Sequence, residues 1–381
     1  MLTKHNSTQR DQIEMVALDQ LVPDDHLVRK IEDAIDFTFI YDLVEDMYSE
    51  VGRPSIDPVI LIKLTFIQYT FGIRSMRMTI EEAKTNMAYR WFLGYGFYDK
   101  VPHFSTFGKN YERRFKDTDL FEQIFYRILK TAAEKKLIST EHVFVDSTHV
   151  KASANKHRFE KKVVRKETRA YQERLQEEIN DDREGHGKKP FPPDKFEKEE
   201  SKEIKESTTD PESGYYVKDE RTKQFAYSFH AAADRHGFVL DAIVTPGNTH
   251  DSHVLEPLVE KVIMKIGKPK AVAADAAYKT PAITKYLFEN EITPALPYTR
   301  PRTKEGFFRK HEYVYDEHFD CYLCPAGEVL KYSTTNKEGY REYKSPKDIC
   351  ATCPFLSQCT ESKDHQKVVT RHIWQEYVEE A

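Results

Sequence analysis

The spacing of apolar and polar residues divides the chain into two parts. Up to about residue 140, apolar residues recur at the spacing of helices, most clearly in IDPVILIKLTFIQYTFG (56–72). Asp57 followed by Pro58 is a helix start, and Gly72 is a helix end. The stretch between them is apolar nearly all round and contains Lys63, so it predicts a buried helix that is too short to span a membrane.

Three more helices are expected in this first part. TIEEAKTNMAYRWFLG (79–94) opens with Thr79 and Glu82 at the spacing of a capping box and closes on Gly94. Another helix is expected from Ser105, and a further one over DLFEQIFYRILKTAAEKKL (119–137). Residues 1–140 are therefore interpreted as a helical domain, and a basic last helix in such a bundle suits docking on DNA.

The second part, 141–381, has the texture of strands alternating with helices. EHVFVDSTHV (141–150) is strand-like, and QFAYSFHAAAD with GFVLDAIVT predicts a hairpin around DRHG (234–237). A helix, a strand, a second helix and a last strand follow between residues 252 and 298. This order predicts a mixed α/β sheet with flanking helices.

Two segments are expected to interrupt that sheet domain. Residues 156–223 carry 18 basic and 18 acidic side chains and few apolar ones, so we expect a charged insertion with no core of its own. Its sequence TRAYQERLQEEIND (168–181) is typical of an exposed helix. Residues 311–363 form a cysteine-rich region. Because the sheet pattern resumes directly after the insertion, both segments are assigned to one domain.

The overall charge gives no evidence for nucleic-acid binding, since the formal net charge is −5. Residues 74–116, however, contain nine basic and four acidic side chains. A local basic face matters more to a phosphate backbone than the total does, and Arg113 and Arg114 are the expected phosphate contacts. No apolar stretch has the length of a membrane span and the N-terminus has no signal-peptide core, so we expect a cytoplasmic protein.

Two aspartates are the candidates for chemistry. Asp146 ends the strand-like run VFVD, and Asp275 ends the short apolar run AVAAD; small residues follow both. Two such carboxylates from distant parts of the chain can converge on a divalent cation, Mg²⁺ or Mn²⁺, which prefers oxygen ligands and assists phosphoryl transfer. The alternative at this point is two unrelated strand-end aspartates.

Five cysteines form a separate group near the C-terminus. Cys321 with Cys324, and Cys350 with Cys353, are Cys-x-x-Cys pairs, and Cys359 follows. In a cytosolic chain this spacing favours a structural zinc site over disulfides, with Cys359 as the substitute if one of the four points away. The alternative is a set of reduced cysteines that line a small core.

Three motifs in this order, VFVDSTHVKA, FHAAADRHGFVLDAIVTPGNTHDS and AVAADAAYKT, resemble the bacterial insertion-sequence transposases of the DDE class. GRPSIDPVILIKLTFIQYTFGIRS and NMAYRWFLGYGFYDKVPHFSTFGK resemble the helical domain that precedes the core in one large branch of that class. The resemblance implies an RNase H-like core in which Asp146 and Asp275 are the first two metal-binding acids. It also implies that His250 and Asp251 support them.

The resemblance further implies a DNA transposase that binds the terminal inverted repeats of an insertion element. Such an enzyme hydrolyses a strand and joins the freed 3′-hydroxyl to target double-stranded DNA, and it works as a homo-oligomer in a synaptic complex. Two alternatives stay open: a DNA-binding remnant or repressor without catalysis, and another RNase H-like endonuclease.

The third acid of the resembling transposases lies in a stretch similar to Glu-Arg-x-Phe, and no such stretch occurs after Asp275. Glu376, Glu379 and Glu380 belong to an expected terminal helix, but they come before the place of that motif. We therefore expect a truncated chain that is a poor transposase or an inactive one.

Overall fold

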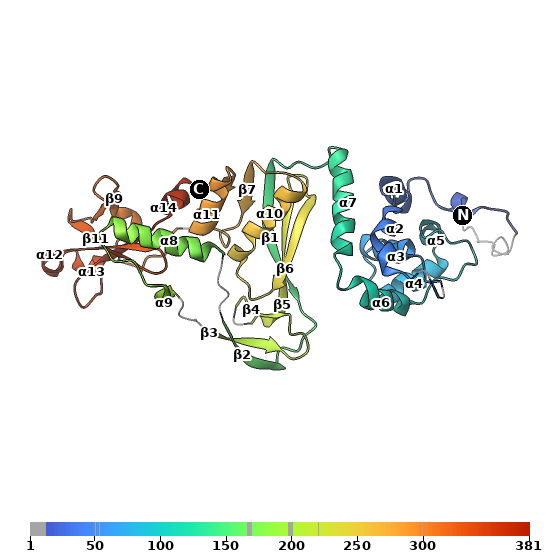
Figure 1. Cartoon of the computed structure of the whole chain (residues 1–381), viewed down its shortest axis with the longest axis horizontal. Helices are drawn as coiled ribbons and strands as arrows, with labels where there is room; N and C mark the ends of the chain where they lie inside the picture. Colours follow the sequence, from blue (N-terminus) through green and yellow to red (C-terminus); the bar gives the residue numbers. More distant parts are fainter. Residues whose placement is uncertain are drawn as a thin grey trace, which may run out of the picture. The chain divides into compact units, whose positions relative to one another are not determined.

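The computed structural model describes residues 13–49, 51–52, 54–165, 170–196, 201–219, 221–298 and 300–381. The chain divides into two units, Met1–Lys135 and Lys136–Ala381, each with its own packing (Figure 1). None of the helices in these described ranges is both long and apolar enough to cross a membrane.

The first unit is a bundle of short helices. Its α-helices are α1 (Leu27–Ala34), α2 (Phe39–Val44), α3 (Pro58–Thr70), α4 (Met76–Thr85), α5 (Met87–Phe92), α6 (Phe104–Asn110) and α7 (Leu120–Glu134). Two 3₁₀ turns, η2 (Leu18–Leu21) and η3 (Glu45–Met47), and a π-helical turn, η4 (Tyr111–Phe115), complete it.

Helix α3 lies at the centre of this bundle, as its apolar sequence predicts. The Asp57 side chain accepts a hydrogen bond from the Val59 amide at 2.8 Å and caps the helix, and Pro58 fills the first turn. Lys63 is buried in its middle, with Nζ 2.6 Å from Glu32 and 3.0 Å from the Phe92 carbonyl oxygen. The buried ammonium is thus paired, as a charge in a core must be.

The expected helix 79–94 is wrong at its start and in its middle. Helix α4 begins three residues earlier, because Ser75 and not Thr79 accepts the capping hydrogen bond, from the Met78 amide. Asn86 then ends α4 and accepts hydrogen bonds from the amides of Ala88 and Tyr89, which starts α5. A capping asparagine inside the apolar pattern divides one expected helix into two.

The second unit is built on an eight-stranded sheet. Its strands are β1 (His142–Lys151), β2 (Phe159–Arg165), β3 (Ser201–Ser207), β4 (Gly214–Val217), β5 (Lys223–Asp234), β6 (Val239–Pro246), β7 (Ala271–Ala274) and β8 (Thr293–Ala295). The order is β2-β3-β4-β5-β1-β7-β8, and β6 also pairs with β5.

Strand β1 lies between two neighbours of opposite direction. It is antiparallel to β5 and parallel to β7, which in turn is parallel to β8. Helix α10 (Leu255–Lys265) follows the turn η5 (Asp251–His253) and leads into β7. Helix α11 (Pro281–Glu289) connects β7 to β8. The expected fold class, a mixed α/β sheet with flanking helices behind an all-α region, is confirmed.

The charged insertion packs against both sheets of the second unit. Its strands β2 and β3 form an antiparallel pair that extends the main sheet through β4. Between them, α8 (Ala170–Gly185) and α9 (Pro193–Phe196) are helical. Helix α8 buries Ile179 completely and runs beside β11 (Figure 1), so the expectation of an exposed helix is wrong.

The cysteine-rich region forms a second sheet of five strands. Its order is β13-β12-β11-β10-β9, with bounds β9 (Val314–Asp316), β10 (Cys321–Leu323), β11 (Val329–Thr335), β12 (Tyr340–Lys344) and β13 (Val368–His372). The turn η6 (Lys310–Glu312) and the helices α12 (Lys347–Ala351), α13 (Leu356–Cys359) and α14 (Gln375–Glu380) accompany it.

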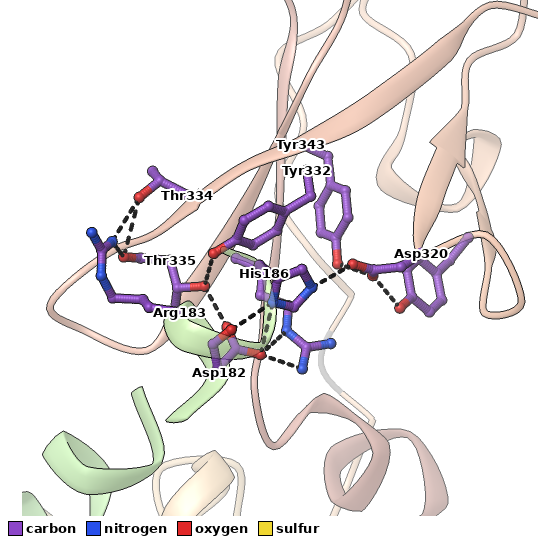
Figure 2. A network of polar contacts seen from close by, with 10 residues as sticks. Asp182, Arg183, His186, Asp320, Tyr332, Thr334, Thr335 and Tyr343 are labelled. Carbon is purple, nitrogen blue, oxygen red and sulfur yellow. Dashed lines mark hydrogen bonds and ion pairs between the residues drawn. The ribbon is translucent and has the colours of Figure 1, made fainter. Parts of the chain in front are cut away.

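A polar network attaches α8 to this second sheet, and Figure 2 shows its members side by side. The Asp182 carboxylate accepts hydrogen bonds from the Thr335 hydroxyl and from Arg341 Nε, the latter at 2.8 Å. Arg183 donates to the Thr335 carbonyl oxygen at 2.7 Å. His186 stacks on a tyrosine ring and places Nε2 2.8 Å from the carboxylate of Asp320. Several charge-assisted hydrogen bonds therefore fix the insertion helix in place.

We expect Asp182→Asn to lower the stability of the second unit by about 2 kcal/mol, because it leaves Arg341 without its buried counter-charge. The cost is below that of a fully buried ion pair, since the Arg341 side chain is still 26% exposed to solvent. Asp181→Asn, at the exposed neighbouring position of the same helix, is the control. Urea midpoints and limited proteolysis of both variants measure the effect, and equal midpoints would contradict it.

His372 on β13 gives the second sheet a pH dependence. Its side chain is buried, its Nδ1 accepts a hydrogen bond from the Trp374 amide at 3.0 Å, and burial lowers its pKa from 6.5 to about 4. Below about pH 6.5 the His372 imidazole takes up a proton in the unfolded chain, whereas in the folded chain it stays neutral until the pH approaches 4. Stability from this residue is complete above pH 6.5 and falls as the pH drops toward 4, by about 3 kcal/mol in total.

The measurement is the unfolding free energy of the wild type, His372→Asn and His318→Asn between pH 7 and pH 4. Asparagine retains an acceptor for the Trp374 amide but does not titrate, so His372→Asn should lose this part of the pH dependence. His318 is exposed in the turn between β9 and β10 of that sheet, and its variant should follow the wild type. Parallel curves for all three proteins would refute the assignment.

Candidate functional site

The structure places Asp146 and Asp275 next to one another in the main sheet. The last registered pair of β1 and β7 is Val145 with Ala274; Asp146 is the next residue of β1, and Asp275 is the first residue after β7 ends. Neighbouring strands lie about 4.8 Å apart, and residues at the same step of a parallel pair point to the same face. Both aspartates are exposed. Two carboxylates from segments over a hundred residues apart therefore share one edge of the sheet.

Backbone amides orient both carboxylates. Asp146 Oδ1 accepts a hydrogen bond from the Ser147 amide at 2.7 Å, and Asp275 Oδ1 accepts one from the Ala277 amide at 3.0 Å. The Asp275 contact also closes the turn that follows β7. Each side chain is held by local geometry, as a preorganised ligand requires.

Asp146 belongs to an open, apolar face of the sheet. Phe144 precedes it on the same side of β1, and the register with β5 and β6 adds Phe229 and Val244. These three apolar side chains are 47%, 39% and 59% exposed. The opposite face is covered, and there Val143 and Val145 are buried. The Asp146 carboxylate thus lies on an exposed, apolar face of the sheet.

Behind the aspartates, on the covered face, lies a polar cluster centred on Asp251. Ser147 Oγ donates a hydrogen bond to Asp251 Oδ2 at 3.4 Å, and His230 Nδ1 lies 3.9 Å from Asp251 Oδ1. His230 Nδ1 is also 3.0 Å from the Tyr278 hydroxyl, and its Nε2 is 3.2 Å from Thr245 Oγ1. His230 and Tyr278 are fully buried. The cluster joins β1, which carries Asp146, and the turn after β7, which begins with Asp275, to the central strand β5.

The electrostatics of this cluster favour uncharged partners around Asp251. Burial lowers the pKa of His230 below its ordinary value, although the nearby Asp251 charge acts in the opposite direction. Burial also raises the pKa of the Tyr278 hydroxyl, with further upward contributions from Asp251, Asp275 and Asp146. His230 is therefore neutral at neutral pH and Tyr278 keeps its proton, so both remain available for hydrogen bonds without adding charge.

Comparison with protein families identifies the family to which the chain belongs. Residues 138–347 match a family model described as a transposase DDE domain, and residues 323–381 match a second model of that description. Residues 16–113 match a model described as a transposase domain. The first match spans more than half of the chain. The chain belongs to the DDE transposase family. Enzymes of this family generally use divalent metal ions.

One solved structure is similar in part, described as the Mos1 transposase paired-end complex with left transposon end. The identity is 11% and the TM-score 0.21. The match covers 68% of this chain and 65% of that one, so this chain spans less than two thirds of the length of the structure it matches. No curated protein matched the chain.

His250 and Asp251 differ in what they contact. His250 is exposed, and its Nδ1 accepts a hydrogen bond from the Ser252 amide at 3.2 Å, so it caps η5. Asp251 points inward to the cluster described above. The turn before them approaches the backbone of Gly214 so closely that a Cβ there would lie 2.2 Å from the Asn248 side chain. A glycine in the insertion thus permits the turn that positions Asp251.

Sequence reasoning missed Ser147, His230 and Tyr278. Ser147 and Tyr278 are each within three residues of a candidate aspartate, inside motifs that the sequence analysis had singled out. His230 lies in the middle of a strand, and only the register of β1 with β5, which pairs Ser147 with His230, brings it to the site.

The described ranges contain no group of three or more His, Cys, Asp or Glu side chains already arranged to hold a metal ion. Glu379, one of the acids considered for a third position, instead forms an ion pair with Arg371 at 2.5 Å. The same helix, α14, packs on α11 through Tyr377 and Phe288. Among the described residues, the site on the main sheet thus offers two exposed carboxylates and the inward-facing Asp251.

The two arginines expected to contact DNA have different surroundings. Arg113 is exposed. The guanidinium of Arg114 lies 4.5 Å from the centre of the Tyr48 ring, donates to the Met47 carbonyl oxygen at 3.2 Å, and also bonds to Asn110. Arg114 therefore fixes η4 within its own unit, and Arg113 is the better candidate for a phosphate contact.

Four of the five cysteines line one pocket, and the set differs from the expected one. The pocket walls include Cys324, Cys350, Cys353 and Cys359. Cys321 is not among the lining residues; it is buried within β10, and burial together with Asp316 and Asp320 raises the pKa of its thiol. All five are free thiols.

Proposed function

We propose that this member of the DDE transposase family acts on DNA through a site formed by Asp146 and Asp275. The observation that supports this most directly is that each aspartate directly follows a member of the last registered pair of two neighbouring parallel strands, Val145 and Ala274. Two oxygen-ligand side chains at that spacing suit a hard divalent cation, Mg²⁺ or Mn²⁺. When bound, the cation would activate the attacking oxygen and neutralise charge on the phosphate.

The chain's own residues have distinct tasks in this proposal. Asp146 and Asp275 supply the oxygen ligands, and the amides of Ser147 and Ala277 hold their orientation. On the covered face, Asp251 contacts Ser147 of β1 and His230 of β5 and so holds β1 in position beside β5. The open apolar face around Asp146 gives a nucleic-acid backbone access to the carboxylates. Asp251 is accordingly a positioning residue.

The first unit is proposed to bind double-stranded DNA, including the terminal repeats of an element. Its support is the local basic excess of residues 74–116. Not all of these cations are available, since Arg90 is buried and donates to the carbonyl oxygens of Gly96 and Asp99. Exposed Arg113 remains suited to a phosphate. Synapsis of two element ends would involve more than one copy of the chain.

A second candidate function is DNA binding without strand cleavage. The observation in its favour is that no group of three metal-ligating side chains occurs among the described residues. A site with two exposed carboxylates holds a cation more weakly than one with three. Strand cleavage of element ends by the 381-residue protein distinguishes the two functions.

We expect Mn²⁺ to bind weakly at the aspartate pair, and Asp146→Asn or Asp275→Asn to weaken that binding by at least about tenfold, because each removes a charged oxygen ligand. Residual cleavage of element ends should fall by about a hundredfold or more. Asp219→Asn, in the exposed turn between β4 and β5, is the control. Titration calorimetry and a nicking assay measure both effects; unchanged Mn²⁺ binding in both site variants would remove the aspartates from the site.

A second prediction compares the two arginines. Arg113→Ala should weaken binding to duplex DNA about three- to tenfold and reduce the salt slope by about one, without changing the melting temperature. Arg114→Ala should instead lower the melting temperature, because it removes the contacts with Tyr48 and Met47. Fluorescence anisotropy at several salt concentrations and thermal scans separate these effects. Full DNA affinity in Arg113→Ala would place the contact elsewhere.

A further inference from the structure

The pocket between the second sheet and its short helices brings four thiols together from three places in the chain. Cys324 follows β10, Cys350 lies in α12 with Cys353 in the turn after it, and Cys359 ends α13. Apolar and aromatic side chains, Phe308 and Leu330 among them, form the remaining wall. Thiolates in an apolar setting are the ligands that zinc prefers in structural sites.

The region around these thiols has little else to hold it. Helices α12 and α13 have five and four residues, and neither contains a buried residue. The buried apolar core of the second sheet consists of only five side chains, namely Tyr313, Tyr322, Leu330, Tyr343 and Val369. Helices of this length are unstable alone, and so small a core normally needs a covalent or metal link. The disulfide alternative does not apply here, since all five cysteines are free.

Hydrogen bonds already prepare two of the four sulfurs. The chain reverses after Cys324, whose carbonyl oxygen accepts from the Gly327 amide at 2.8 Å, and whose sulfur accepts from the Glu328 amide at 3.3 Å. The sulfur of Cys359 lies 3.3 Å from the Tyr313 hydroxyl. These contacts fix the position of both sulfurs in the pocket, as a preorganised ligand requires.

A positive charge also lies at the pocket. Lys367 lines it, and its Nζ donates to the Cys359 carbonyl oxygen at 3.0 Å and lies 5.1 Å from the centre of the Tyr313 ring. Four thiolates around one Zn²⁺ leave a net negative charge. A partly buried ammonium beside the sulfurs offsets part of that charge.

From these observations we propose that Cys324, Cys350, Cys353 and Cys359 bind one structural zinc ion and that Cys321 does not take part. Binding would draw the sulfurs to about 2.3 Å from the metal. It would also move them, because the described residues include no group of three ligands already arranged for a metal. The ion would thereby fix α12 and α13 against the second sheet. This site is separate from the aspartates and independent of the proposed DNA chemistry.

The experiment measures zinc in the purified 381-residue protein and in two variants that each remove one thiol. Cys359→Ser should lose at least about tenfold in zinc affinity, whereas Cys321→Ser should retain the zinc content of the wild type. Replacement of zinc by Co²⁺ gives the second readout, because the visible and near-ultraviolet absorption of cobalt reports tetrahedral thiolate ligation. Competition with a chromophoric chelator gives the affinities.

If Cys359→Ser does not fold, the cobalt spectrum of the wild type and of Cys321→Ser decides alone. A four-thiolate spectrum in both supports the proposal. Three results would overturn it: wild-type protein free of zinc with all thiols titratable, a cobalt spectrum without tetrahedral thiolate bands, or loss of the metal in Cys321→Ser. None of these outcomes depends on DNA cleavage.

Discussion

The register of β1 between β5 and β7 is the constraint on which the candidate site depends. In that register Asp146 and Asp275 directly follow the last registered pair of β1 and β7, and Ser147 lies opposite His230 on the other face of β1. A slip of one residue would exchange the two faces of β1, placing Asp146 in the core and Val145 in solvent. The buried valines on either side of Phe144 set the register, because only one alignment buries them. A packing preference thus determines where the carboxylates lie.

Polar groups perform two separate tasks around this strand. The exposed carboxylates retain their charge and their access to solvent, as suits a metal ligand. The covered face carries a neutral histidine and a protonated tyrosine that share a hydrogen bond, and the Ser147 hydroxyl donates to Asp251. Burying those groups without partners would cost free energy, so the cluster is satisfied from within. Function and stability are divided between the two faces of one sheet.

The charged insertion connects the parts of the second unit. Helix α8 contacts the second sheet through Asp182 and Arg183, and on another side Glu178 pairs with Lys285 of α11. The antiparallel strands β2 and β3 of the insertion extend the main sheet. Gly214, also in the insertion, makes room for the turn that precedes Asp251. A segment with balanced charge and little apolar content therefore gains its order from ion pairs with surfaces that lie elsewhere in the chain.

The sequence by itself determined the local elements and the kinds of chemistry. Periodicity and capping residues predicted α3, α7 and the hairpin of β5 with β6, because such signals depend only on near neighbours. The short apolar runs that precede Asp146 and Asp275 identified the candidate ligands, although Asp146 proves to lie inside β1 and Asp275 just after β7. Sequence spacing could not place Arg114 against Tyr48, separate Cys321 from the other thiols, or bring His230 behind Asp146. Those relations depend on strand register and on packing between distant segments, and only the tertiary structure decided them.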